Sequence, residues 1–234
     1  DQEPVDVQEL LHCAQGTGGG KVNMKAVLDY LSALEQNNTR EWYHANKQQL
    51  KGANCTFEEL VHLLNLKVST FDDSVPVFEA KNLTFKLVCD TRFSSDKSPY
   101  NPVFRAHIGP KGKLPVPVGY YIMIRPGNRS FLGGGLFTDM FKDATTMVRD
   151  YIVSHGDKWQ EMVSSSNFAK SFVVEGSKLK KVPYSYDSTH PQEEYLKYKS
   201  WYLEYPIEDD IIMDSHFVDI SASIFEQMQP FNAF

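Results

Sequence analysis

The sequence predicts an α+β protein, a single domain with a largely antiparallel sheet packed by helices. Apolar residues recur at helical spacing over residues 24–64, alternate with polar residues at a period of two over residues 83–137, and then return to helical spacing. Short loops rich in glycine and proline join the period-two segments, as is typical of neighbouring antiparallel strands. Helices and strands that are segregated along the chain in this way favour the α+β class.

Length and composition favour one large domain preceded by a tail. The chain has 234 residues, of which 41% are hydrophobic, enough to bury a full core. We expect an N-terminal extension over residues 1–22 and a single α+β domain over residues 23–234. The extension contains three adjacent glycines, Gly18–Gly20, and few apolar residues, so we expect it to be flexible and peripheral to the fold.

The charge balance restricts the classes of partner. A formal net charge of −6 argues against a broad surface for nucleic acid or for anionic membranes. No apolar run approaches the roughly 18 to 20 residues that a membrane helix needs. We therefore expect neither a nucleic-acid partner nor a membrane partner, while a local basic pocket for a small anion remains compatible with the composition.

The cysteines bear on redox state and location. Cys13, Cys55 and Cys89 are odd in number and widely spaced, and they form no C-x-x-C pair. This pattern indicates neither a disulfide framework nor a cysteine zinc site. We expect reduced thiols and a cytoplasmic location, with a removed leader left open because the chain begins with Asp.

Three helices are expected before the sheet. The first covers residues 24–34, and the second begins at Asn38 in a capping-box pattern and runs toward Gly52. Thr56 repeats the capping signal and predicts the start of a third helix. Later helices are expected around residues 141–152, 159–163, 195–199 and 217–228.

Strands are expected where the period is two, over residues 83–88, 104–108, 118–125, 129–137 and 201–205. The run Gly133–Gly135 lies inside one of them, which is the wrong context for a phosphate-binding loop. Two interpretations remain open. In the first, which we favour, the glycines allow another element to pack closely. In the second, they expose backbone amides to a ligand.

The stretch Arg92–Tyr100 holds two cations, a carboxylate and a phenol between two predicted strands. Pro99 restricts the backbone there, so these side chains lie on a rigid turn. Arg92 and Lys97 are the cations, and Asp96 can neutralise only one of them locally. A salt-bridged turn and an anion-binding site are equally compatible with this pattern.

Histidine and lysine near the C-terminal third give further candidates. His190 precedes Pro191 close to Lys199, where it could act as an acid, a base or a ligand. A histidine that caps the following helix is the simpler interpretation. No pair of histidines has metal-ligand spacing, so neither a metal site nor a cofactor is expected.

Several ordered motifs together carry a resemblance. These are Asn37–Trp42, Asn46–Lys47, Arg92–Phe93, Asp96–Tyr100, Gly119–Tyr121, Gly133–Gly135, His190–Pro191 and Lys199. In this combination the chain resembles the bacterial family catalogued as domain of unknown function two-four-six-one, over about residues 24–203. The resemblance implies a single α+β domain in which these polar residues come together, and it implies no activity.

Two functions follow as hypotheses. The first is a cytoplasmic binding module with a polar cleft for a small anionic ligand. The second is an enzyme that acts on a small, for example phosphorylated, substrate through the same cleft of arginine, lysine and histidine. The candidate ligand-binding residues are Arg92, Asp96, Lys97, Tyr100, Tyr121, Gly134, His190 and Lys199.

Overall fold

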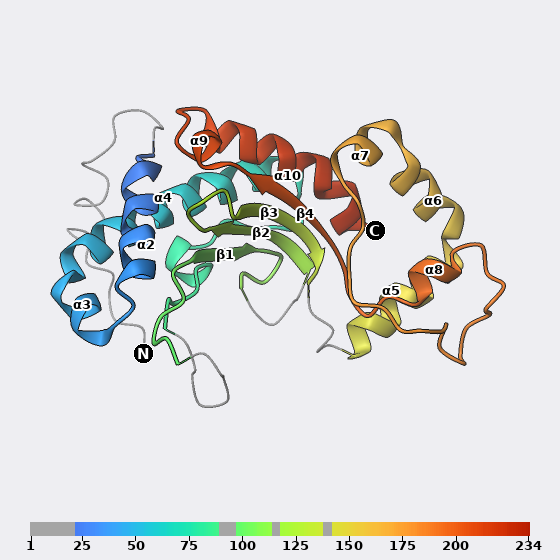
Figure 1. The fold of residues 1–234 in the computed structure, drawn as a ribbon. Helices are drawn as coiled ribbons and strands as arrows, with labels where there is room; N and C mark the ends of the chain where they lie inside the picture. The colour runs from blue at the N-terminus through green and yellow to red at the C-terminus, as the bar shows by residue number, and fades with distance from the viewer. Residues whose placement is uncertain (1–21, 89–96, 114–117, 138–141) are drawn as a thin grey trace, which may run out of the picture.

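One antiparallel sheet organises the fold (Figure 1). The computed structural model describes residues 22–88, 97–113, 118–137 and 142–234. Its four strands follow one another in space as they do in the chain, in the order β1 (Phe104–Ile108), β2 (Val118–Ile124), β3 (Ser130–Leu136) and β4 (Trp201–Ile207). All three strand pairs are antiparallel, so the predicted α+β class and the largely antiparallel sheet are confirmed.

Helices pack on one face of this sheet and at its two ends. The described helices are α2 (Met24–Gln36), α3 (Arg40–Ala45), α4 (Lys47–Phe71), the 3₁₀ helix η1 (Ala80–Asn82), α5 (Lys142–Ser154), α6 (Gly156–Ser164), α7 (Ser166–Ser171), α8 (Glu193–Leu196), α9 (Asp209–Ile212) and α10 (Phe217–Ala233). Helices α4 and α10 lie over one face, α2 and α3 lie at one end, and α5 to α8 lie at the other (Figure 1). No described helix is long and apolar enough to cross a membrane.

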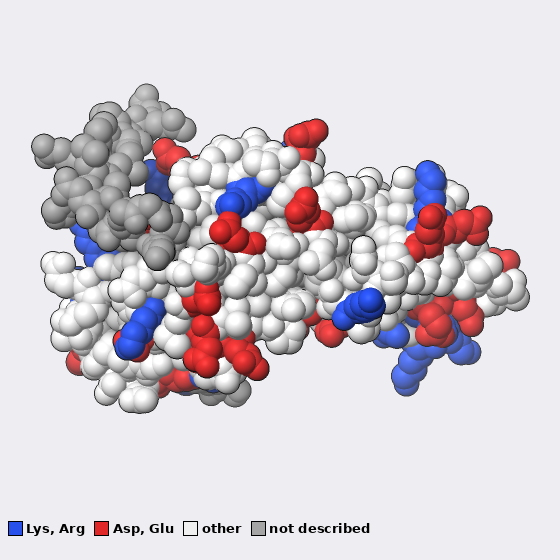
Figure 2. All heavy atoms as spheres, turned by 90° about the horizontal axis from the view of Figure 1, so that it is seen from above, with Lys and Arg blue, Asp and Glu red and all other residues white. Residues whose placement is uncertain are grey.

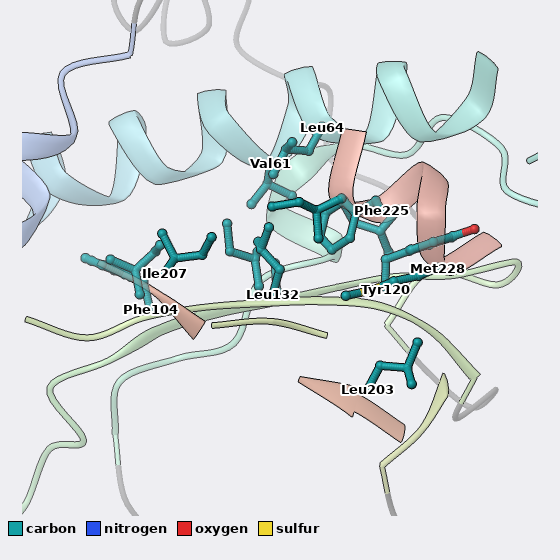
Figure 3. Close-up of a cluster of buried hydrophobic side chains, with 14 of the residues drawn as sticks. Val61, Leu64, Phe104, Tyr120, Leu132, Leu203, Ile207, Phe225 and Met228 are labelled. Carbon is teal, nitrogen blue, oxygen red and sulfur yellow. The ribbon is translucent and has the colours of Figure 1, made fainter. Parts of the chain in front are cut away.

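The main core lies between the sheet and the α4–α10 layer (Figure 3). The Phe57 ring of α4 stacks on Phe104 of β1 with centroids 5.2 Å apart, and Phe225 of α10 meets Tyr120 of β2 edge to face at 5.3 Å. All four side chains are almost completely buried. Burial of side chains of this size stabilises the fold by roughly 2 to 3 kcal/mol each, which holds both helices on this face.

Helix α4 differs from the prediction, because it runs through 25 residues without a break at Gly52 or a new start at Thr56. The Thr56 hydroxyl donates to the carbonyl of Gly52 at 3.1 Å, one turn back, so it does not cap a new helix. The buried stripe continues from Ala53 through Leu64 on one side of the helix. Long-range packing of this stripe outweighs the local cost of one glycine.

The segment over residues 83–88 also differs from the prediction. Residues 83–88 were predicted as a strand, yet they form only isolated bridges, at Thr84 with Ala106 and at Val88 with Tyr100. Two hydrogen bonds join this segment to β1, from Phe85 N to Arg105 O and from His107 N to Leu83 O, each 3.0 Å long. The segment therefore borders β1 without a continuous ladder.

The expectation of reduced thiols is wrong for Cys55, which is disulfide-bonded. The other two cysteines of the sequence, Cys13 and Cys89, lie outside the described residues. Disulfide formation depends on the distance and direction between two Cβ atoms in the folded chain. Sequence spacing does not contain that information.

Candidate functional site

We call the face of the sheet opposite α4 and α10 the open face, because no described helix lies over it in Figure 1. Cross-strand pairing places His107, Tyr121, Gly133 and Glu204 in one row across the four strands. A neighbouring row is formed by Arg105, Met123, Phe131 and Pro206. Directly paired residues of antiparallel strands point to the same side, so both rows belong to the open face.

A chain of four rings runs across the open face. His107 contacts Tyr121 with centroids 4.4 Å apart, Tyr121 contacts Phe137 at 4.4 Å, and Phe137 stacks on Tyr202 at 4.6 Å. The His107 ring is buried, and the other three rings are half-buried. We call these four residues the aromatic row. Its three half-buried rings, those of Tyr121, Phe137 and Tyr202, give the open face an apolar surface that retains contact with solvent.

Two glycines make room for the aromatic row. A Cβ atom on Gly119 would lie 2.5 Å from Nε2 of His107, and one on Gly133 would lie 2.4 Å from Cζ of Phe137. Both distances are far below van der Waals contact. The glycines in β2 and β3 therefore allow the rings to lie directly against the backbone, as is usual for glycine within strands that another group approaches closely.

His107 is held neutral beneath the open face. Its Nδ1 atom lies 3.0 Å from the carbonyl oxygen of Gly112, which can only accept, so Nδ1 carries the proton. Burial lowers the pKa of His107 from 6.5 to about 4. Its Nε2 atom is buried and has no hydrogen-bond partner among the described residues. The uncharged ring therefore connects β1 to the turn at Gly112 through this hydrogen bond.

Two cations lie near the Phe85 ring at the β1 edge of the open face. The guanidinium carbon of Arg105 lies 5.4 Å from the centre of the Phe85 ring, and Nζ of Lys113 lies 5.3 Å from the same centre. Lys113 also donates to the carbonyl of Thr84 at 2.7 Å. Within the described residues neither cation has a carboxylate partner, and the buried Nε of Arg105 has no acceptor. We call Phe85, Arg105 and Lys113 the basic edge.

Two carboxylates lie at the opposite, β4 edge. Glu175 pairs with Tyr202 through two backbone hydrogen bonds of 2.8 and 3.0 Å, and Glu204 lies two residues further along β4. Burial and, after it, the charge of Glu175 raise the pKa of Glu204. Burial, Glu204 and Glu175 also raise the pKa of Tyr202. We call Glu175, Tyr202 and Glu204 the acidic edge.

The described residues also form a pocket on the helical side of the molecule. A shallow pocket of about 220 Å³ lies between α4 and α10, with Lys67, Phe71, Asp219 and Glu226 among its lining residues. Its lysine is paired, since Lys67 lies 2.6 Å from Asp219. The view over this side shows basic and acidic side chains interspersed, with no large area of one sign among the described atoms (Figure 2). The pocket therefore lacks the unpaired cations that mark the basic edge.

The residues predicted for the Arg92–Tyr100 turn are only partly described. Arg92 and Asp96 lie outside the described residues, whereas Lys97 and Tyr100 lie inside them. The Tyr100 ring is buried and stacks on Tyr43 with centroids 3.8 Å apart. Asn38 holds its backbone, accepting from Tyr100 N at 3.2 Å and donating to Tyr100 O at 2.8 Å. Tyr100 thus packs against α3 and does not contribute a side chain to the open face.

Two predicted residues in the middle of the sheet lie on opposite faces. Tyr121 belongs to the open face, and burial raises its pKa to about 12. Gly134 faces α10, where a Cβ atom would lie 3.0 Å from Sδ of Met228. The missing side chain of Gly134 therefore lets α10 pack closely on β3, in line with the interpretation favoured from the sequence.

The last two predicted residues lie near α8. Nδ1 of His190 accepts a hydrogen bond of 3.0 Å from the backbone N–H of Gln192, just before α8. The backbone N–H of Lys199 donates to Ser177 O at 2.8 Å, and its carbonyl accepts from the Thr145 hydroxyl at 3.3 Å. Tyr121 is the predicted residue that strand pairing places on the open face.

Sequence reasoning missed most of the open face. Arg105 and His107 alternate with the predicted core residues Phe104, Ala106 and Ile108, and this alternation was the available signal. No comparable signal marked Phe137 or Glu204, because their positions relative to the other residues of the open face depend on the pairing of β3 with β4. Within the described ranges no group of three or more histidine, cysteine, aspartate or glutamate side chains could hold a metal ion.

Fold and site together define an α+β protein whose sheet presents one helix-covered face and one open aromatic face with charged edges. The chain belongs to the family described as conserved hypothetical protein (DUF2461), whose family model matches residues 26–234. The family predicted from the sequence motifs is thereby confirmed. No curated protein and no solved structure matches the chain.

Proposed function

We propose that this protein is a binding module that takes up a small anionic ligand at the basic edge of the open face. One observation carries the proposal: Arg105 and Lys113 share the Phe85 ring, and neither has a carboxylate partner among the described residues. Two cations beside the same ring and without a carboxylate create a local positive potential, which would attract an anion.

The chemistry of Arg105 supports this assignment. A guanidinium offers several N–H donors in a planar fork that matches carboxylate and phosphate groups. The Arg105 side chain is half-buried and its buried Nε lacks an acceptor, which costs free energy in the unliganded protein. An anionic group that accepts from the other N–H groups of this fork would gain charge-assisted hydrogen bonds.

The predicted anion site at Arg92 and Lys97 remains a prediction, and it adjoins the basic edge along the chain. Tyr100 bridges Val88, and Ala106 bridges Thr84, so the turn leads into the same pair of segments that carries Phe85 and Arg105.

An enzyme is the second candidate function, and Glu204 is the observation that favours it. A half-buried carboxyl group with a raised pKa is the kind of group that donates a proton in general acid catalysis. It lies on the same face as Arg105, so a phosphorylated substrate could meet both groups. We rank binding first because no described nucleophile adjoins Glu204 in a hydrogen-bonded arrangement.

We do not include the cytoplasmic location expected from the sequence in the proposed function. A disulfide at Cys55 is typical of an oxidising compartment and not of the cytoplasm.

Titration calorimetry with inorganic phosphate, sulfate and small phosphate esters tests the proposal. The wild type should bind at least one of them, and Arg105→Met should weaken binding by about 10- to 150-fold, the equivalent of about 1.5 to 3 kcal/mol for a hydrogen bond to a charged group. Arg129→Met is the matched control, because Arg129 is exposed and paired with Glu35 at 2.6 Å. Equal binding by wild type and Arg105→Met, or no binding at all, would contradict the proposal.

A further inference from the structure

The open face has opposite charges at its two edges. Arg105 and Lys113 form the basic edge beside β1, and Glu175 and Glu204 belong to the acidic edge beside β4. We propose that the ligand of the open face is a short peptide with free termini, bound in extended form with its carboxylate at the basic edge and its ammonium group at the acidic edge. This inference rests on the proposed anion site, because it assigns that site to the peptide carboxylate.

The acidic edge suits an ammonium group. Paired residues of antiparallel strands share a face, so Glu175, Tyr202 and Glu204 all project from the same side of the sheet. Neither glutamate forms an ion pair with a basic residue of the described ranges. An ammonium group between two carboxylates and the face of a tyrosine ring would gain charge-assisted hydrogen bonds and a cation–π contact.

The surface between the two edges suits apolar side chains. Tyr121, Phe137, Met123 and Phe131 are half-buried and carry no formal charge at neutral pH. Phe131 also lies near Phe137, with ring centroids 6.2 Å apart. A peptide with apolar side chains would bury the remaining apolar surface of these residues, a gain of about 25 cal/mol per Å². A purely inorganic anion would leave this surface uncovered.

The separation of the edges sets the length of the peptide. From β1 to β4 there are three strand spacings of about 4.8 Å, and Arg105 and Glu204 are offset by two residues, about 7 Å along the strands. The combined span is about 16 Å. An extended chain covers at most about 3.3 to 3.6 Å per residue, so about five residues reach from one edge to the other.

The pentapeptide Ala-Phe-Ala-Phe-Ala tests the inference in four forms: with free termini, N-acetylated, C-amidated, and blocked at both ends. We expect the free form to bind in calorimetry, each single block to weaken it at least tenfold, and the doubly blocked form to show no heat of binding. The dipeptide Ala-Phe should bind at least tenfold more weakly than the free pentapeptide, because it cannot reach both edges.

Variants assign each terminus to its edge. Glu204→Gln should remove the effect of N-acetylation, and Arg105→Met should remove the effect of C-amidation. Glu208→Gln is the matched control, since Glu208 is exposed just beyond β4 and should leave all four affinities unchanged. Circular dichroism melts of each variant show that the fold persists.

The outcomes separate this inference from the proposed function. If the acetylated peptide binds as tightly as the free one, or if phosphate binds and no pentapeptide does, the peptide inference is wrong and the anion site stands. If Arg105→Met binds every form as well as the wild type does, both are wrong. A dipeptide as tight as the pentapeptide also overturns the inference, since the ligand then does not span the face.

Discussion

The ring of Phe137 lies directly against Gly133, so that a Cβ atom on Gly133 would fall 2.4 Å from the Cζ atom of the ring. Phe137 also contacts Tyr121 on one side and Tyr202 on the other, and it thereby joins β2 to β4 across β3. The absence of a side chain at Gly133 is thus one condition for a continuous aromatic row, beside the glycine at position 119.

Gly133→Ala should therefore displace Phe137 and destabilise the protein. We expect the free energy of unfolding in urea to fall by about 1 to 3 kcal/mol, the usual cost of overpacking. Gly52→Ala is the control, because nothing lies within 4 Å of a Cβ atom at this exposed position in α4. It should raise the stability by about 0.5 to 1 kcal/mol, and equal effects of the two substitutions would contradict the role of Gly133.

His107 should make the fold sensitive to mild acid. Burial lowers its pKa from 6.5 to about 4, so between these values the unfolded chain binds a proton that the folded protein does not. The contribution of neutral His107 to the free energy of unfolding is fully present above pH 6.5. It is lost as the pH falls toward 4, by roughly 3 kcal/mol in total.

Urea unfolding at pH 7 and pH 5 measures this loss. His107→Asn retains a donor toward Gly112 and does not titrate, so its stability should change less between the two pH values than that of the wild type. Identical changes would show that His107 is not the responsible group.

Glu204 should oppose stability at neutral pH in the protein without ligand. Burial, and the charge of Glu175 after it, raise the pKa of Glu204, so the folded protein disfavours its ionised form. This penalty is present above the raised pKa and disappears as the pH falls below the ordinary pKa of a glutamate.

Glu204→Gln should consequently raise the midpoint of thermal unfolding at pH 7 and leave it nearly unchanged at pH 4. Glu208→Gln provides the comparison at an exposed position of the same region. A lower midpoint for Glu204→Gln at pH 7 would indicate that the carboxylate is paired in the folded protein.

The thiol content follows from the disulfide at Cys55. With three cysteines in the chain, one disulfide within it leaves one thiol. Titration with a thiol reagent in guanidinium chloride should detect one thiol per chain without reductant and three after reduction. Three thiols before reduction would contradict the disulfide.

Local patterns in the sequence determined the class of fold. The period of two in residues 104–108 and 118–124 predicted β1 and β2, and the helical stripe from Met24 predicted α2. The motifs were sufficient to indicate the family. These features depend on the spacing of neighbouring residues, because alternation and helical periodicity express which side of one element faces the core.

The tertiary structure alone decided which side chains meet. Tyr121 and Gly134 are both in the middle of the sheet but lie on opposite faces. Arg105, which was not predicted, lies at the candidate site, whereas the predicted His190 lies just before α8. Strand register sets these neighbours, since a shift of one residue moves every side chain to the other face. Register in turn depends on packing between residues far apart in the chain, such as Glu204 with Gly133, which no local pattern contains.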